Sequence, residues 1–238
     1  MNRSRVKKEV LGLLEASSPP YLFKKLHSLE TEKVIGPLFS GLCNPSEKVR
    51  WNAVRAFGYI VPELAERSLE KGRVVMRRFL WSLNDESGGI GWGSPEAMAE
   101  VMCNCTVLRQ EYLHMLISYM HEDGDDPFQD GNYLELPMLQ RGLLWGVGRL
   151  CERVPQEMEP LDIAGDLKKY LKSPDPYVAG NAMLALSYLS ADVPDNSVAR
   201  HLSSTLFLRL YIGDSLREVA LAELARLATR KISLDELR

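Results

Sequence analysis

Apolar residues return along this chain every three or four positions, which is the spacing of one face of an α-helix. The pattern is clear in VRWNAVRAFGYI (49–60), whose apolar face consists of Val49, Ala53, Ala56, Phe57 and Ile60. It also predicts a helix near the start, over about residues 2–15. An alternation of apolar and polar residues, the signature of a half-buried strand, is not convincing in any segment. The pattern therefore predicts an all-α protein.

The helical pattern is also repeated. The segment 49–60 aligns with VAGNAMLALSYL (178–189), and similar turns, LCNPSEK and LKSPDPY, precede the two. Identical residues stand at the aligned pairs Val49/Val178, Asn52/Asn181, Ala53/Ala182, Ala56/Ala185 and Tyr59/Tyr188. Further copies are LQRGLLWGVGRL (139–150), LREVALAELARL (216–227) and a diverged copy that starts at Ser94.

Aligned reference positions give the period of the repeat. The steps between them are 44, 46, 39 and 38 residues, and the positions are Ala53, Ala97, Leu143, Ala182 and Ala220. HEAT-like helical hairpins have periods of roughly 40–47 residues. In each copy an apolar helix leads into a turn and then into a second, amphipathic helix. One copy cannot bury its apolar face alone, so the stacking of neighbours forms the core.

These observations predict one domain over residues 1–238, an all-α HEAT-like α-solenoid. We expect a right-handed superhelix of about five antiparallel helix pairs. Residues 1–30 are expected to form N-terminal capping helices, residues 31–228 the repeats, and residues 229–238 a C-terminal cap.

The two longest steps mark insertions at residues 84–94 and 121–137. Both lie at turns between paired helices, so we expect them on the same edge of the solenoid. Repeat proteins often recognise partners through such edges and the adjoining concave surface. The acidic loop of the second insertion does not match a calcium loop, because Phe128 falls at a ligand position when Gly131 is aligned with the invariant glycine.

Three segments carry a resemblance to a known family. They are VVMRRFLWSLNDESGGIGWGSPEAMAEV (74–101), VRWNAV (49–54) and LQRGLLWGVGRL (139–150). With these segments the chain resembles a family of bacterial HEAT-repeat proteins, of the HEAT-like, PBS-lyase-type repeat, to which no activity is assigned. The resemblance covers nearly the whole chain. It implies the repeat fold and leaves the activity open.

The charge of the chain limits its partners. The net charge is −3 and the isoelectric point is near 5.9, which argues against a dedicated nucleic-acid-binding protein. Residues 1–80 carry a net charge of +7 and residues 81–165 carry −11. This asymmetry allows self-association between the two regions, or the binding of an acidic partner. It is equally compatible with weak surface fields that salt screens and that bind no partner. No apolar run reaches the ~18 residues of a membrane span, and we expect a cytoplasmic protein.

The cysteines and histidines predict neither a metal nor a cofactor. The cysteine spacing matches no zinc pattern, and buried free thiols are expected at Cys43, Cys103, Cys105 and Cys151. A metal site with His114 and His121 would need a favourable fold-back of the chain. Deoxyhypusine hydroxylase, a HEAT-repeat enzyme, has repeated His-Glu pairs, whereas this chain has the one pair His121-Glu122.

A tryptophan and an arginine recur on the second helices. Opposite the apolar face of segment 49–60 stand Trp51 and Arg55, and the equivalent positions of the third copy hold Arg141 and Trp145. Second helices of HEAT arrays usually line the concave face. There the four side chains are predicted to be exposed and to hold a peptide by stacking, cation–π contact and carboxylate pairing. The alternative is local Trp–Arg stacking that covers the groove.

The segment NDESGGIGWGSPEAM (84–98) is rich in glycine but lacks both GxGxxG and the Walker pattern. Ser94 is predicted as the N-cap of a helix, with Pro95 at its first position. Backbone N–H groups beside a helix start can bind an anion, so a ligand site is a candidate at Gly91, Trp92, Gly93 and Ser94. The alternative is a structural turn that buries Ile90 and Trp92 between repeats.

The sequence thus predicts a non-catalytic interaction module or scaffold that binds a protein or peptide segment in its concave groove. The alternative is a ligand- or anion-binding protein, or an enzyme, that uses the insertion 84–98. Among enzymes, a HEAT-like DNA glycosylase would use Trp51, Arg55 and Trp145, although the acidic centre of the chain argues against it.

Overall fold

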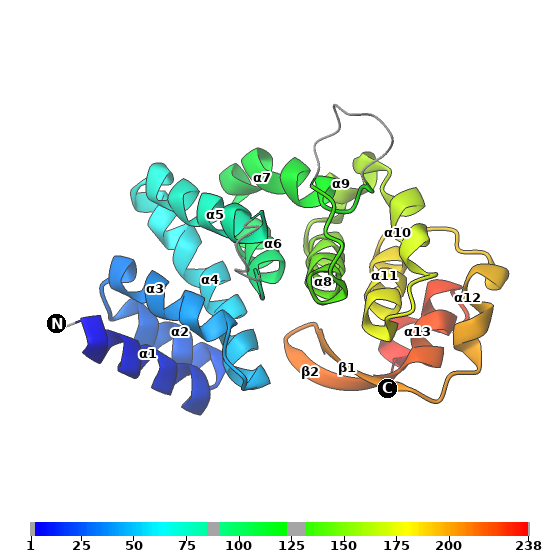
Figure 1. The fold of residues 1–238 in the computed structure, drawn as a ribbon, viewed down its shortest axis with the longest axis horizontal. Helices are drawn as coiled ribbons and strands as arrows, with labels where there is room; N and C mark the ends of the chain where they lie inside the picture. Colours follow the sequence, from blue (N-terminus) through cyan, green and yellow to red (C-terminus); the bar gives the residue numbers. More distant parts are fainter. Residues whose placement is uncertain (1–2, 85–90, 123–131, 238) are drawn as a thin grey trace. The chain divides into compact units, whose positions relative to one another are not determined.

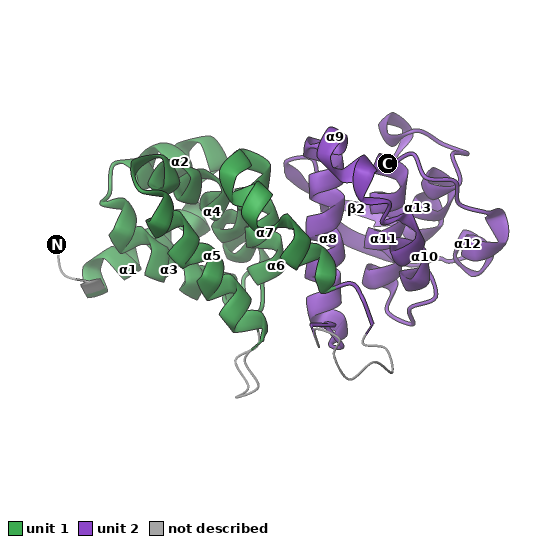
Figure 2. Cartoon of the chain, turned by 90° about the horizontal axis from the view of Figure 1, so that it is seen from above, with its two compact units in different colours: residues 1–119 green, residues 120–238 purple. Residues whose placement is uncertain are grey.

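The computed structural model describes residues 3–84, 91–122 and 132–237. Predictions that fall on residues 85–90 or 123–131, including Ile90 and most of the acidic loop, lie outside the described residues. The chain forms two compact units, which we call unit 1 (1–119) and unit 2 (120–238) (Figure 2). Each unit is described by itself, and the prediction of one domain over the whole chain stays a prediction.

Unit 1 consists of helices (Figure 1). They are α1 Arg3–Ala16, α2 Pro19–His27, α3 Thr31–Leu42, α4 Glu47–Arg67, α5 Leu69–Leu83, α6 Ser94–Asn104 and α7 Thr106–Ser118. The long helix α4 is central, because α1, α2, α3, α5 and α6 all pack against it. The apolar face predicted for segment 49–60 is buried at every position. Aromatic rings of α3, α4 and α5 close the core, with centroids 4.9 Å apart among Phe39, Phe57 and Phe79.

Unit 2 combines helices with one hairpin (Figure 1). Its elements are α8 Pro137–Arg153, α9 Pro155–Met158, η1 Glu159–Leu161, α10 Ala164–Tyr170, α11 Pro176–Tyr188, α12 Asp195–Leu202, β1 Phe207–Ile212, β2 Ser215–Ala220, α13 Leu221–Ala228 and η2 Leu234–Glu236. Helix α11 is central here and packs on α8, α10 and α13. It begins with an N-cap, because the carboxylate of Asp175 accepts hydrogen bonds from the N–H groups of Tyr177 and Val178.

The second helices of the repeat stack directly on one another within each unit. Helix α4 packs on α6 in unit 1, and α11 packs on α8 and α13 in unit 2. Four reference positions lie fully buried in these helices, namely Ala53, Ala97, Leu143 and Ala182. The two units therefore use the same element, the second helix of each pair, to bury the repeat's small residues.

The recurrent asparagines have the same structural role in both units. Asn52 of α4 donates from Nδ2 to the carbonyl oxygen of Leu14 at 2.7 Å. Asn181 of α11 donates from Nδ2 to the carbonyl oxygen of Arg141 at 3.0 Å. Each asparagine thus ties a second helix to an earlier helix by satisfying one of its backbone carbonyls, which explains why the residue recurs.

The fifth copy departs from the prediction. Its helix, predicted from Leu216, begins only at Leu221, because the preceding residues form β2 in an antiparallel hairpin with β1. Ile212 pairs with Ser215, so the loop has two residues, and the first of them is Gly213 with φ +61°. A glycine at this position is what a tight hairpin turn requires. The prediction that the chain has no strand was wrong, and the signal was FLRLYI followed by Gly-Asp.

The start of α6 is displaced by one residue from the prediction. Gly93, with φ +74°, is the N-cap, so Ser94 and Pro95 occupy the first two helical positions. A residue in the left-handed region favours glycine, which explains why the cap is not the serine. Among the described residues, no helix has the length and apolar character needed to cross a membrane.

Candidate functional site

Arg141, Trp145 and Arg149 stand four residues apart on α8 and therefore share one face of the helix. The Arg141 side chain is 41% exposed. Its guanidinium binds Asp175 in a two-pronged pair, with Nε 3.0 Å from Oδ1 and Nη2 2.6 Å from Oδ2. It also lies 4.7 Å from the centre of the Tyr177 ring. Arg141 thus links α8 to the first turn of α11 and remains partly open to solvent.

Trp145 corrects the prediction that all four groove residues are exposed, because it is only 6% exposed. Its Nε1 donates to the carbonyl oxygen of Tyr211 at 2.7 Å, and the two rings meet edge to face with centroids 6.2 Å apart. The reason is the hairpin, which the sequence analysis did not foresee: β1 packs against this side of α8 and α11.

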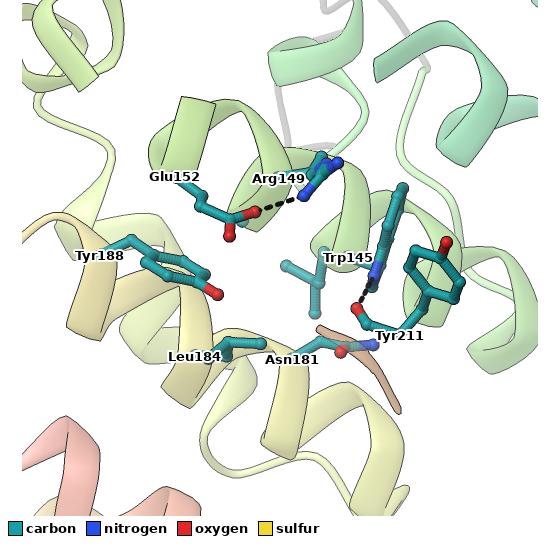
Figure 3. Close-up of a pocket in the computed structure, with 9 residues that line it drawn as sticks. Trp145, Arg149, Glu152, Asn181, Leu184, Tyr188 and Tyr211 are labelled. Carbon is teal, nitrogen blue, oxygen red and sulfur yellow. Dashed lines mark hydrogen bonds and ion pairs between the residues drawn. The ribbon is translucent and has the colours of Figure 1, made fainter. Parts of the chain in front are cut away.

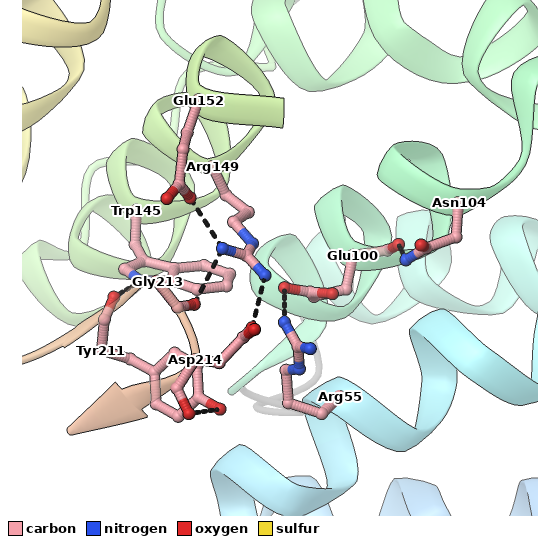
Figure 4. A network of polar contacts seen from close by, with 9 residues as sticks. All are labelled: Arg55, Glu100, Asn104, Trp145, Arg149, Glu152, Tyr211, Gly213 and Asp214. Atoms are coloured by element: carbon pink, nitrogen blue, oxygen red, sulfur yellow. Dashed lines mark hydrogen bonds and ion pairs between the residues drawn. The ribbon is translucent and has the colours of Figure 1, made fainter. Parts of the chain in front are cut away.

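Arg149 is also buried and binds the hairpin turn. One terminal nitrogen donates to Glu152 at 2.7 Å and to the carbonyl oxygen of Gly213 at 2.8 Å, and the other donates to Asp214 at 3.1 Å (Figure 4). Trp145 therefore binds a backbone carbonyl group of strand β1, and Arg149 binds one of the hairpin turn. Side-chain donors on successive turns of one helix make that recognition possible.

Between α8 and α11 lies a narrow opening, which we call the slot (Figure 3). Its volume of about 10 Å³ admits one group the size of a water molecule. It is lined by Leu144, Trp145, Gly148, Arg149, Glu152, Asn181, Leu184, Tyr188 and Tyr211. The helices lie close together here, since a Cβ atom at Gly148 would stand 3.4 Å from the Cβ of Ala185, in ordinary van der Waals contact.

Asn181 supplies the slot with an acceptor. The side chain is 4% exposed, and its Oδ1 atom is buried without a hydrogen-bond partner among the described residues. Its Nδ2 atom is already bonded to the carbonyl oxygen of Arg141, which fixes the orientation of the amide. A buried carbonyl oxygen without a partner costs free energy unless a donor reaches it. Asn181 is therefore the residue in unit 2 that most needs a ligand or solvent donor.

Tyr188 and Glu152 complete the polar part of the slot, and both point into the space between the helices (Figure 3). Burial, and then the Glu152 carboxylate, raise the pKa of Tyr188 above its usual range, so the phenol stays protonated. One oxygen of Glu152 binds Arg149, and the carboxylate of Asp214 binds the same guanidinium. Two carboxylates thus bind one guanidinium, and the guanidinium of Arg217 also acts on the Tyr188 phenol.

In unit 1, the corresponding residues lie on α4. Trp51 is half-buried, and Arg55 donates to the buried carboxylate of Glu100 on α6 at 3.1 Å (Figure 4). The expectation that Arg55 is solvent-exposed is therefore wrong, because its guanidinium neutralises a carboxylate that the packing of α6 on α4 removes from water. The role of Trp51 and Arg55 in partner binding stays a prediction.

In the glycine-rich candidate at Gly91–Ser94, the start of the helix uses part of its own hydrogen-bonding capacity. Ser94 donates its N–H to the carbonyl oxygen of Gly91 at 3.0 Å, Pro95 has no N–H, and the N–H of Glu96 is hydrogen-bonded to its own carboxylate. A Cβ atom at Gly91 would stand 2.8 Å from the carbonyl oxygen of Ser82, so this backbone is tightly packed. The anion site at Gly91–Ser94 stays a prediction.

Trp92 and Ser94 lie in different environments. Trp92 is 37% exposed, so the prediction that the turn buries it was wrong, whereas Ser94 is buried. Gly93 packs on Leu42, which anchors the turn to α3. Two residues into the helix, the Oε2 atom of Glu96 is buried without a partner among the described residues, and burial raises the pKa of this carboxyl to about 7. This carboxylate opposes an anionic ligand further.

A second cavity of about 250 Å³ opens in unit 2. It is lined by Met120, Glu122, Tyr133, Gln140, Lys169, Tyr170, Lys172, Ser173 and Pro174. Gln140 donates to the hydroxyl of Tyr133 at 3.0 Å, and Tyr170 donates to the carbonyl oxygen of Met120 at 2.9 Å. Its lining includes two lysines and one glutamate, which are of opposite charge and favour neither a cation nor an anion.

The cysteines and histidines form no site in the part of the chain that the structure describes, where no group of three or more potential ligands could hold a metal ion. Cys151 is buried as expected, but Cys43 is exposed, because it follows the last turn of α3. His121 bonds Asp166 at 3.1 Å in an exposed pair.

Sequence reasoning missed most of the slot. Asn181 and Tyr188 had been matched to Asn52 and Tyr59 as repeat positions, and that match was the available signal. Glu152 gave no signal because its role depends on Arg149 and on the packing of α11.

No protein-family model matches the chain, and no curated protein matches it in sequence. Solved structures do match. The designed armadillo repeat protein YIII(Dq)4CqI is 16% identical with a TM-score of 0.52, and the match covers 97% of this chain and 93% of that one.

Two further structures agree. The designed armadillo repeat protein YIII(Dq.V1)4CPAF, in complex with peptide (KR)4, is 14% identical with a TM-score of 0.53, and an engineered protein is 12% identical with a TM-score of 0.52. Each match covers 94% of this chain and 90% of the other. Such identities establish the fold and no function. The chain is an all-α solenoid of helical repeats similar to designed armadillo repeat proteins.

Proposed function

We propose that this protein is a non-catalytic interaction module that binds an extended segment of a partner protein on its second helices. The observation that carries the proposal is the buried, unpartnered Oδ1 atom of Asn181 in the slot between α8 and α11. A solvent-accessible notch with an unsatisfied acceptor is a feature that a partner's donor can complete.

The hairpin supports the proposal by its mode of attachment. Trp145 and Arg149 hold the backbone oxygens of Tyr211 and Gly213, as a groove would hold the backbone of a bound peptide. In this proposal Trp145 forms the wall of the slot, and Arg141 contacts the partner beside it. Trp51 and Arg55 remain proposed contacts in unit 1.

The comparisons add a limited argument. One similar designed armadillo repeat protein has a structure in complex with the peptide (KR)4, so a solenoid of this type can hold an extended peptide. Repeat proteins generally recognise partners on such surfaces. The alternative, a ligand-binding protein or glycosylase, has less support, because Trp145 is buried and the carboxyl group of Glu96 lies buried in the first turn of α6, where an anion would bind.

A display library of random linear peptides, selected against the purified protein, tests the proposal. Enriched peptides are then measured by fluorescence anisotropy against the wild type and Arg141→Ala, with Arg226→Ala, exposed on α13, as the matched control. We expect the Arg141 variant to weaken binding roughly tenfold, since a partly exposed charged contact contributes about 1–2 kcal/mol.

Circular dichroism must first establish that both variants are folded, because Arg141 also binds the N-cap residue Asp175. Selection without enrichment, or enriched peptides that bind the Arg141 variant as tightly as the wild type, would contradict binding on this surface.

A further inference from the structure

We infer that the slot between α8 and α11 binds a primary ammonium group, such as the side-chain tip of a lysine. The inference rests on the proposed function only for the source of that ammonium, a partner segment. The chemical identity of the ligand is inferred from the slot itself, namely from its acceptors, its aromatic walls, its size and its charged groups.

The polar groups of the slot are mainly acceptors. Asn181 offers its unpartnered Oδ1 atom, and Glu152 has a second carboxylate oxygen beside the one that binds Arg149. The hydroxyl of Tyr188 points into the same space (Figure 3). An ammonium group has three N–H donors and no acceptor, which matches this set. A carboxylate or phosphate, which only accepts, would leave Asn181 unsatisfied.

The apolar walls favour a cation rather than a neutral donor. The ring of Trp145 lines the slot beside those of Tyr188 and Tyr211. Aromatic faces attract ammonium groups through the ring quadrupole, and more strongly where water is excluded. Leu144 and Leu184 provide the apolar contact that the methylene stem of a lysine needs.

The size of the slot separates ammonium from guanidinium. A volume of about 10 Å³ holds one atom-sized group with its hydrogens, as for a water molecule. A guanidinium is planar and carries three nitrogens, so it would have to separate α8 from α11. Such a separation would cost the packing of α8 on α11, which lie close together at Gly148 and Ala185.

The charge around the slot is compatible with an added cation. Arg149 is the one buried guanidinium among the lining residues, and its donors are directed at Glu152, Gly213 and Asp214. Arg217 also lies close enough to the Tyr188 phenol to act on its pKa, so two guanidiniums stand near the two carboxylates. An ammonium inside the slot would be attracted by the Glu152 carboxylate, whereas an anion there would be repelled by it.

A titration of the whole ¹⁵N-labelled protein with n-butylammonium chloride tests the inference. The NMR signals to follow are the indole N–H of Trp145 and the side-chain amide of Asn181. We expect both to shift and to saturate, whereas butan-1-ol and sodium butyrate at equal concentration leave them in place. Equal shifts with the alcohol, or no shift with the amine, would overturn the inference and leave the slot as a hydration site.

Two conservative variants make the test specific. Tyr188→Phe removes one hydroxyl, and Glu152→Gln removes one charge, and each is expected to weaken butylammonium binding roughly fivefold or more. The matched control is Tyr59→Phe, at the equivalent repeat position on α4, and it should bind as the wild type does. Unchanged affinity in both slot variants would refute the assignment.

Peptides separate the inference from the proposed function. Enriched peptides are resynthesised with each lysine replaced by norleucine or arginine. Loss of binding on both replacements supports the lysine slot, whereas binding that survives them overturns it and leaves the proposed function standing. Butylammonium binding without any enriched peptide would support the slot for a small free amine and count against the proposed function.

Discussion

At the scale of single residues, buried polar groups decide more of this molecule than its exposed charges do. Asn181 and Glu96 each bury an oxygen that has no partner among the described residues. Asn52, by contrast, donates to two carbonyl oxygens of the N-terminal segment, those of Leu14 and Ser17. The same residue type thus serves packing in one copy and packing plus an open acceptor in another. Only the surroundings separate the two roles.

Glu96 gives a residue-scale prediction for the pH dependence of stability. Burial raises its pKa from 4.5 to about 7, so the folded state binds a proton more tightly than the unfolded state. The free energy of unfolding should therefore fall as the pH rises from about 4.5 to 7, and this loss amounts to about 3 kcal/mol. Glu96→Gln should remove the loss, which urea denaturation of both proteins at pH 4 and pH 8 measures.

The difference between the two proteins isolates this group from the other titrating residues. At pH 4 the free energies of unfolding should nearly agree, and at pH 8 the variant should be the more stable. A variant that is equally destabilised at both values would mean that the carboxyl is needed for packing and that its protonation has no effect.

At the scale of elements, the close approach of second helices is the feature that holds the repeats together. A Cβ atom at Gly58 of α4 would stand 2.9 Å from the Cβ of Glu100 on α6 and 3.0 Å from its carbonyl oxygen. The glycine is therefore needed where two helices cross, even though glycine weakens a helix by itself. The hairpin is the second such feature, because it covers a helix face that the sequence pattern leaves polar.

Gly58→Ala should destabilise unit 1 by about 1–3 kcal/mol, because the added methyl group must push α6 away from α4. Gly36→Ala is the matched control: it lies exposed in α3 with nothing within 4 Å of an added Cβ, and it should stabilise by up to about 1 kcal/mol. Urea denaturation compares the two. Equal effects of both substitutions would show that the helix crossing does not constrain Gly58.

The hairpin gives a second element-scale prediction. Trp145→Phe removes the donor to the Tyr211 carbonyl and should loosen β1 without unfolding unit 2. A lost hydrogen bond of about 1 kcal/mol corresponds to backbone amide exchange roughly fivefold faster in residues 207–220. Hydrogen-exchange mass spectrometry measures this, with α4 as the internal control. Unchanged exchange in the hairpin would mean that Leu208 and its apolar neighbours anchor it without the indole.

At the scale of the whole molecule, the charge is distributed unevenly along the sequence. Residues 1–80 carry +7 and residues 81–165 carry −11. We expect weak association of copies through these regions at low ionic strength, which sedimentation velocity over a range of protein concentrations detects. Salt above about 0.3 M should abolish this association, since the Debye length is then only about 5 Å and charges on the two copies are screened from each other. Association that persists in high salt would point to an apolar interface instead.

The sequence by itself determined the helices, their pairing and the period. Apolar spacing of three and four, small residues at fixed positions and proline-bearing turns are local or periodic signals. They identified α4, α8 and α11 as second helices and identified their buried faces. The match of Asn52 with Asn181 and of Tyr59 with Tyr188 was equally visible. Part of the slot was therefore present in the alignment, although its function was not.

Tertiary structure alone decided which polar residues are exposed. Trp145, Arg149 and Arg55 look exposed on a helical wheel, and each is covered by a segment distant in sequence: β1, the hairpin turn or α6. The fifth copy differs from its predicted helix for a related reason. Its small residues fit a helical pattern, whereas the Gly-Asp turn before them permits a hairpin. A periodic pattern records which side of a helix is apolar, whereas burial of the other side depends on long-range packing that periodicity does not encode.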